Sequence, residues 1–199
     1  MLARNEAHRT LLLAMAEEDK RVRDELTREG SLSGGYHPRM EAVHIANANA
    51  LRDLLADGWP KAADVGEDGQ EAAWLIVQHA IGLPPFLRQC RELLQNAVQH
   101  GEAPAWQLAM LTDRICVLEG RAQLYGTQFD WDENGVMSPL PIEDAPGVEQ
   151  RRAQVGLEPL THATSRHRSN ARQSGELPPL DRIRYLAEQE AWLKRTGWR

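Results

Sequence analysis

The sequence predicts a mainly α-helical protein: a bundle of about five principal helices with one small β-hairpin and a C-terminal helix on a linker. Three observations predict this class. Apolar residues recur at helical spacing in five successive segments. Gly and Pro residues separate these segments. One stretch, around Asn134-Gly135, carries the signal of a β-hairpin. We expect a helical core domain over 1–160 with its hairpin at about 123–140, a polar basic linker over 161–179, and a C-terminal helix over 180–199.

Composition limits the classes of function. The 199 residues are 42% hydrophobic, enough for one well-cored domain, and the N-terminus has no apolar run of signal-peptide or membrane-span length, so a cytoplasmic protein without membrane contact is expected. Residues 1–160 hold 15 basic and 25 acidic residues, net −10, whereas residues 161–199 hold 8 and 4, net +4. The acidic core makes nucleic-acid binding unexpected. The basic C-terminal helix could contact its own body or another protein chain.

The first two expected helices each place polar residues on an apolar face. The first, over residues 3–28, carries Asp19 on its apolar stripe, and Arg23 follows four positions later, in reach of an ion pair. A Gly- and Ser-rich loop over residues 30–35 comes next. The second helix begins at Pro38 and ends near Asp57, and its stripe includes His44 and Asn47.

The next three helices form the expected centre of the core. The third, over residues 70–82, is apolar almost all round, so we expect His79 to be desolvated and to favour its neutral form. The fourth begins at Pro84 and ends before Gly101. The fifth, from Trp106 to Gly120, carries Asp113 in the middle of an apolar stripe. Cys90 and Cys116 lie on apolar stripes of these last two helices and are expected to be buried thiols.

After Gly120 the pattern changes. Residues 123–140 predict two short strands, and residues 147–155 predict a short helix. Residues 161–179 are polar and basic with little to bury, which is typical of a linker.

Four helices thus place a polar residue on an apolar face: Asp19, His44 with Asn47, His79, and Asp113. Each would cost about 1–3 kcal/mol if buried without a partner, so they predict either a shared structural network or a site. In the site interpretation the protein is an enzyme acting on a small polar molecule, with hydrolase or lyase as the expected classes. His79 is then the general acid or base and Asp113 orients it. The expected binding residues are Asp19, Arg23, His44, Gln78, Arg114, Gln123, Tyr125 and Gln128.

Two alternatives stay open. Two His and one or two Asp side chains could hold a divalent metal, but HExxH, ExxH and CxxC patterns are lacking, so the sequence assigns no metal ligand and no cofactor. The protein could instead be a non-catalytic binding, immunity or regulatory protein. In that case the polar residues form a structural network and the C-terminal helix makes the contact.

Several separated motifs also resemble a known family. They are GWP at 58–60, VG at 65–66, AAWLIVQHA at 72–80, LTDRICVLEGRAQLYGTQF at 111–129, PIED at 141–144 and RRAQVGLEPL at 151–160. Together they resemble an uncharacterised bacterial family, a domain of unknown function, over most of residues 10–160. The resemblance extends to the Asp-x-x-x-Arg pair of Asp19 and Arg23, and departs from the family at Ile81, where an Asp often follows Gln-His-Ala. It implies a shared fold and motif positions, and no reaction.

Overall fold

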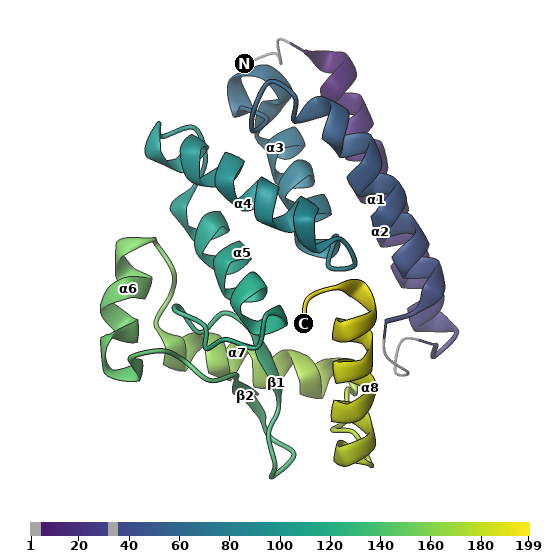
Figure 1. The fold of residues 1–199 in the computed structure, drawn as a ribbon, viewed down its shortest axis with the longest axis vertical. Helices are drawn as coiled ribbons and strands as arrows, with labels where there is room; N and C mark the ends of the chain where they lie inside the picture. The colour runs from purple at the N-terminus through teal and green to yellow at the C-terminus, as the bar shows by residue number, and fades with distance from the viewer. Residues whose placement is uncertain (1–4, 32–35) are drawn as a thin grey trace. The chain divides into compact units, whose positions relative to one another are not determined.

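The computed structural model describes residues 5–31 and 36–199. Within these ranges it contains eight α-helices and one two-stranded antiparallel sheet (Figure 1), so the predicted fold class is confirmed. The chain divides into two compact units, Met1–Ala103 and Pro104–Arg199. The single core domain expected over residues 1–160 spans this boundary. No described helix combines the length and apolar character needed to cross a membrane.

The first unit consists of four helices. They are α1 (Glu6–Arg28), α2 (Pro38–Leu54), α3 (Ala62–His79) and α4 (Pro84–Gln99). Helix α1 packs along both α2 and α3 (Figure 1). The predicted apolar stripes are confirmed, since Leu12, Val22 and Leu26 of α1 and Phe86, Cys90 and Leu94 of α4 are all buried. Residues 3 and 4 of the expected first helix, and residues 32–35 of the expected loop, lie outside the described residues.

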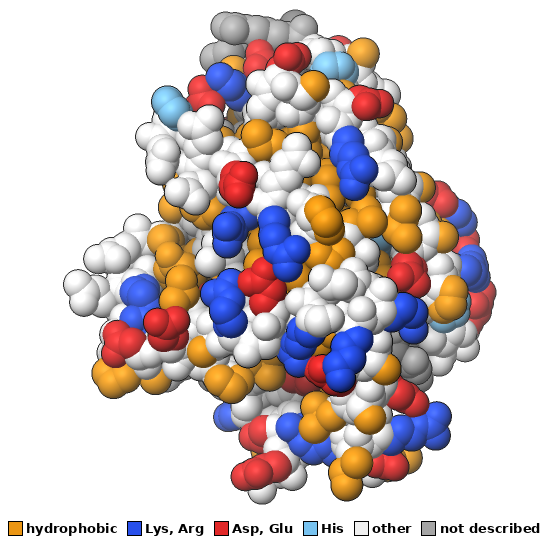
Figure 2. All heavy atoms as spheres, in the orientation of Figure 1, with side chains coloured by type: hydrophobic (Ala, Val, Ile, Leu, Met, Phe, Trp, Pro, Cys, Tyr) orange, Lys and Arg blue, Asp and Glu red, His pale blue; other side chains and the backbone are white. Residues whose placement is uncertain are grey.

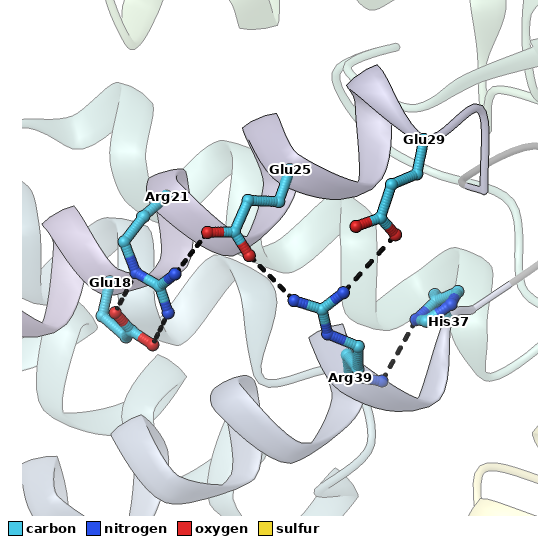
Figure 3. A network of polar contacts seen from close by, with 6 residues as sticks. All are labelled: Glu18, Arg21, Glu25, Glu29, His37 and Arg39. Carbon is cyan, nitrogen blue, oxygen red and sulfur yellow. Dashed lines mark hydrogen bonds and ion pairs between the residues drawn. The ribbon is translucent and has the colours of Figure 1, made fainter.

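Ion pairs link the outer faces of α1 and α2 (Figure 3). Arg39 of α2 reaches across to Glu25 of α1, with Nη2 2.8 Å from Oε2, and its Nη1 lies 3.5 Å from Glu29. Glu25 also forms an ion pair with Arg21, and Arg21 forms a second ion pair with Glu18 on the same helix. These contacts are compatible with the alignment of the two helices that brings Asp19 of α1 opposite His44 of α2.

Helix α3 begins earlier than its sequence pattern suggested. A first turn starts at Ala62, and the helix is then interrupted at Gly66, whose φ of 77° and ψ of 163° are not helical. Glycine suits this position because φ is positive and because a Cβ would lie 2.7 Å from Asp68 Oδ1. Asp68 accepts hydrogen bonds from Gly69 N and from Arg9 of α1. The break therefore fixes the start of the segment that ends at His79.

The second unit combines helices with the hairpin. Its elements are α5 (Ala105–Leu118), β1 (Phe129–Trp131), β2 (Met137–Pro139), the 3₁₀ helix η2 (Ala145–Gly147), α6 (Val148–Gln154), α7 (Leu160–Ser174) and α8 (Arg182–Thr196). The strands pair Phe129 with Pro139 and Trp131 with Met137. Asp132 closes the turn by accepting from the amides of Asn134 and Val136. The predicted hairpin and short helix exist, but residues 123–128 form a loop where strand was expected.

Most of the segment expected as a linker, residues 161–179, is helical and belongs to α7. The helix packs on β2, and its Ala163 and Ala171 are buried. The ring of His167 stacks on that of Phe129, with centroids 4.0 Å apart. Most residues of this helix are Arg, Ser, Thr, His, Asn or Gln, so its mean hydropathy is that of a linker even though two alanines and one histidine ring are packed.

Candidate functional site

The first unit brings together Asp19, His44 and His79, three of the five polar residues predicted on apolar helix faces. The Asp19 carboxylate is 2% exposed, on the face of α1 that packs against α2 and α3. His79 Nδ1 lies 2.7 Å from Asp19 Oδ2, within hydrogen-bonding distance. His44 Nε2 lies 3.0 Å from the same oxygen, but at an angle too poor for a hydrogen bond. One carboxylate oxygen therefore faces two imidazole nitrogens from two other helices.

Tyr36 completes the cluster from the segment just before α2. Its hydroxyl lies 2.6 Å from His44 Nδ1 and 3.5 Å from the backbone oxygen of His79. The Tyr36 ring stacks on that of His44, and the rings of His44 and His79 are 5.0 Å apart. The order Tyr36, His44, Asp19, His79 is thus a continuous chain of polar contacts.

Burial and the neighbouring groups set the charges of this chain. Burial alone would raise the pKa of Asp19, but the polar contacts with His44 and His79 outweigh it and hold that pKa well below its usual range. Burial lowers the pKa of His79, against the opposing effect of Asp19. Burial also raises the pKa of Tyr36. At neutral pH the arrangement is an ionised Asp19 beside a neutral His79 and a neutral Tyr36.

His79 connects this buried cluster to an open groove of about 640 Å³. The His79 side chain is 21% exposed and lines the groove together with Leu75 of α3 and with Ala16, Lys20 and Arg23 of α1. Arg23 Nη2 lies 3.8 Å from Asp19 Oδ1, so the predicted i,i+4 pair is present at long range. Glu17 and Asp19 also line the groove, which therefore offers an imidazole, two cationic side chains, two carboxylates and an apolar wall.

The donors of the cluster are also suited to a metal ion. Asp19, His44 and His79 each provide one ligand atom, and these three atoms all lie within 4.8 Å of one another. Two imidazole nitrogens and a carboxylate oxygen form a donor set that first-row transition metals accept.

Two other polar residues on these apolar faces are buried without joining this chain. Asn47 Nδ2 donates to the backbone oxygen of Met15, so Asn47 links α2 to α1. Gln78 is 3% exposed, and both polar atoms of its side-chain amide lack a hydrogen-bond partner among the described residues.

Asp113 is engaged by a loop of its own unit. Its carboxylate accepts from the backbone amides of Leu124, Tyr125 and Thr127 at 2.7–3.1 Å, and from the Thr127 hydroxyl at 3.0 Å. The carboxylate in contact with His79 is that of Asp19. Within its own unit Asp113 has the geometry of a loop anchor. The expectation that it orients His79 stays a prediction.

The predicted binding residues of the second unit belong to the same loop. Gln123 is fully buried, and its amide exchanges two hydrogen bonds with the backbone of Gln128 and donates a third to Leu140. Tyr125 uses its amide on Asp113 and its carbonyl on Arg152. Gln128 Nε2 donates to Thr127, and Arg114 lies half-buried on α5. A role for these residues in binding a ligand stays a prediction.

Sequence reasoning missed Tyr36 and the paired arginines of α6. Tyr36 precedes its helix, so no helical stripe includes it, and only the tertiary fold places it on His44. Arg151 donates to the carbonyl of Leu124, and the buried Arg152 donates to those of Tyr125 and Glu158. The only sequence feature that pointed to these residues was the pair of adjacent arginines in a short predicted helix, and it did not indicate which groups they contact.

Comparison with curated proteins and with solved structures gives no match. A family profile does match, over residues 7–188. The match extends past residue 160, where the motif resemblance ended, and so includes α7 and part of α8. The chain belongs to DUF6624, a family of unknown function.

Proposed function

We propose that the protein is an enzyme that acts on a small polar molecule in the groove of the first unit, with His79 as the group that moves a proton. The observation that carries this proposal is the contact of His79 Nδ1 with the buried carboxylate of Asp19, 2.7 Å away, at the base of an open groove. An imidazole held in this way is the usual arrangement of a general base.

The proton positions support the role of His79. Ionised Asp19 can only accept, so the neutral imidazole carries its proton on Nδ1 and has its lone pair on Nε2. Nε2 is then the nitrogen that accepts a proton from a substrate group or a water molecule in the groove. Asp19 stabilises the imidazolium that forms, and the proton is returned to the leaving group. This chemistry suits hydrolysis or elimination.

The walls of the groove suggest which molecules fit. Lys20 and Arg23 outnumber the one exposed carboxylate of the groove, that of Glu17, and so favour an anionic group. Leu75 and Ala16 favour a short apolar part. We therefore propose a small organic anion, such as a carboxylate or phosphate ester, as the substrate class.

The test compares the wild-type protein with His79→Gln, which keeps the size of the side chain and removes the base. His100→Gln is the matched control, because His100 is exposed at the end of α4 and does not line the groove. Mixtures of small carboxylates and of phosphate and carboxylate esters are incubated with each protein, and their consumption is followed by NMR. We expect one class to be consumed by the wild type and the His100→Gln variant, and not by His79→Gln. Equal consumption by all three, or none by a folded wild type, would refute the proposal.

A specific observation also supports the rival proposal of a non-catalytic interaction protein. Apolar side chains before and on α8 are exposed, with Leu177 at 79%, Leu180 at 107% and Ile183 at 84%. Figure 2 shows apolar atoms at the surface among the charged groups in the region of α8. In that proposal the Asp19 cluster only stabilises the fold. His79→Gln would then lower the stability without removing any ligand binding, which thermal melting beside the NMR assay distinguishes.

A further inference from the structure

The Asp19 cluster has the donor atoms and spacing of a metal site. Asp19 Oδ2 lies 2.7 Å from His79 Nδ1 and 3.0 Å from His44 Nε2. Around a tetrahedral zinc ion with bonds near 2.1 Å, neighbouring ligand atoms are about 3.4 Å apart. The three donor atoms lie within 4.8 Å of one another, so the most distant pair would have to approach by up to about 1.4 Å, which small rotations of two side chains can supply.

His44 supplies the independent observation. It is 4% exposed, and its Nε2 contacts Asp19 Oδ2 at 3.0 Å without meeting the geometry of a hydrogen bond. A contact of this geometry compensates only part of the cost of burying the nitrogen. A cation held between His44 and Asp19 would satisfy both atoms at once.

The surroundings of His44 already fit a ligand role. Ligating histidines as a rule donate their second ring N–H to an oxygen, which fixes the tautomer and the ring orientation. The Tyr36 hydroxyl lies 2.6 Å from His44 Nδ1 and can accept that hydrogen bond. In the same arrangement Tyr36 donates its own proton towards the carbonyl of His79, 3.5 Å away.

We propose that Asp19, His44 and His79 bind one divalent first-row transition metal ion, such as Zn²⁺ or Co²⁺, with a further coordination position open to the groove. Three protein ligands plus an open position are typical of a catalytic metal site, whereas structural sites are closed. The two nitrogen donors argue against Mg²⁺ and Ca²⁺, which prefer oxygen.

As a cofactor, the metal would deepen the proposed function, and that part of the inference rests on the proposed function. Metal binding by the three side chains does not depend on it. If a metal bound His79 Nδ1, the proton on Nδ1 would leave and Nε2 would take one up from solvent, so the imidazole would change tautomer and stay neutral. A water molecule in the open position then loses a proton more easily and becomes the base in place of His79. His79 in that state donates a hydrogen bond to the substrate.

The charge of Arg23 opposes metal binding, so removing it should raise the affinity for the metal. Arg23 Nη2 lies 3.8 Å from Asp19 Oδ1, so its charge would repel the cation. We expect Arg23→Gln to bind metal more tightly than the wild type, and most clearly at low ionic strength. The ligand variants should change affinity in the other direction.

The experiment is calorimetric titration of the full chain with Zn²⁺, beside absorption spectroscopy with Co²⁺. We expect one ion per chain. We expect a loss of more than about 100-fold in affinity for Asp19→Asn, His44→Gln and His79→Gln, and about tenfold for Tyr36→Phe. His100→Gln should bind as the wild type does. Circular dichroism establishes that each variant is folded.

The outcomes separate this inference from the proposed function. Wild-type Co²⁺ spectra with nitrogen and oxygen ligands, combined with loss of binding in His79→Gln, support the metal site whether or not a substrate is found. Absence of binding by the folded wild type, or binding unchanged in the His44 and His79 variants, would overturn it. The metal-free reaction through His79 would remain possible in that case. The Co²⁺ spectrum of the wild-type protein tests the metal site even if the Asp19 variant fails to fold.

Discussion

At the scale of single residues, the two buried carboxylates differ in what they face. Asp113 faces the backbone amides of a loop, and four donor groups occupy its two oxygens. Asp19 faces ionisable side chains from two other helices, and one of these lines a groove. A carboxylate satisfied by backbone amides is a structural element, whereas one that shares protons with imidazoles can take part in chemistry.

The anchoring role of Asp113 predicts a large effect on stability. Asp113→Ala leaves three backbone amides of the loop without an acceptor in a buried place, so we expect a loss of about 3 kcal/mol or more in the free energy of unfolding. Asp113→Asn keeps one acceptor oxygen and should lose less. Urea denaturation of both variants measures this. A change within about 0.5 kcal/mol for Asp113→Ala would contradict the anchoring role.

His79 predicts a pH dependence of stability. Its pKa is lowered in the folded protein from the ordinary value of 6.5, with burial as the main cause. As the pH falls through 6.5, the unfolded chain takes up a proton that folded His79 resists, so the free energy of unfolding decreases. The lowered pKa of Asp19 acts in the same direction, but only below its ordinary value of 3.8.

We therefore expect the melting temperature to fall between about pH 7.5 and pH 5.5, and to fall less in His79→Gln. The variant loses one of the groups that bind a proton only after unfolding. His100→Gln, at an exposed position, should follow the wild type. A variant curve with the same slope as the wild type would show that His79 does not contribute.

At the scale of elements, α1 and α2 are joined by charges on one face and by the Asp19 cluster on another. The charged groups of Figure 3 are partly exposed, with Arg39 at 49% of its side chain. Exposed ion pairs contribute little, so the alignment of the two helices depends mainly on buried contacts, including that of Asn47 with Met15.

The exposed network predicts a small effect that depends on salt. Arg39→Gln should lower the free energy of unfolding by less than about 1 kcal/mol at low ionic strength, because only solvent-exposed pairs with Glu25 and Glu29 are lost. In about 1 M salt the difference from the wild type should vanish, since the charges are then screened. Urea denaturation at the two salt concentrations tests this, and a larger loss that persists in salt would assign Arg39 a packing role.

At the scale of the whole molecule, the sequence predicts helices better than it predicts partners. Helical periodicity is local, so the stripes of α1 to α5 and the Asn134-Gly135 turn could be identified before any tertiary contact was known. An apolar stripe shows that Asp19, His44 and Asp113 face the inside of the protein, but it does not show which residues they contact there. Asp19 and His44 meet, and Asp113 faces a loop that the sequence pattern had assigned to a strand.

The C-terminal segment shows the same limit. Its composition predicts an appendage, but several of its side chains belong to the second unit. Tyr185 donates to Asp130, Arg182 contacts the carbonyl of Trp131, and Arg199 donates to the backbone oxygens of Val117 and Leu118. Such contacts use polar groups of long side chains, which an analysis of apolar periodicity does not detect.

The burial of the last turn predicts that this segment stabilises the fold. Trp198 is 4% exposed, although it is the second-last residue, whereas Leu180 is fully exposed at the start of the same segment. Trp198→Ala should therefore lower the free energy of unfolding by about 3–5 kcal/mol, and Leu180→Ala should change it by less than about 0.5 kcal/mol. Urea denaturation followed by circular dichroism measures both. If the two variants were equally stable, α8 would not be part of the folded unit, and its exposed apolar residues would then be the first place to look for a partner.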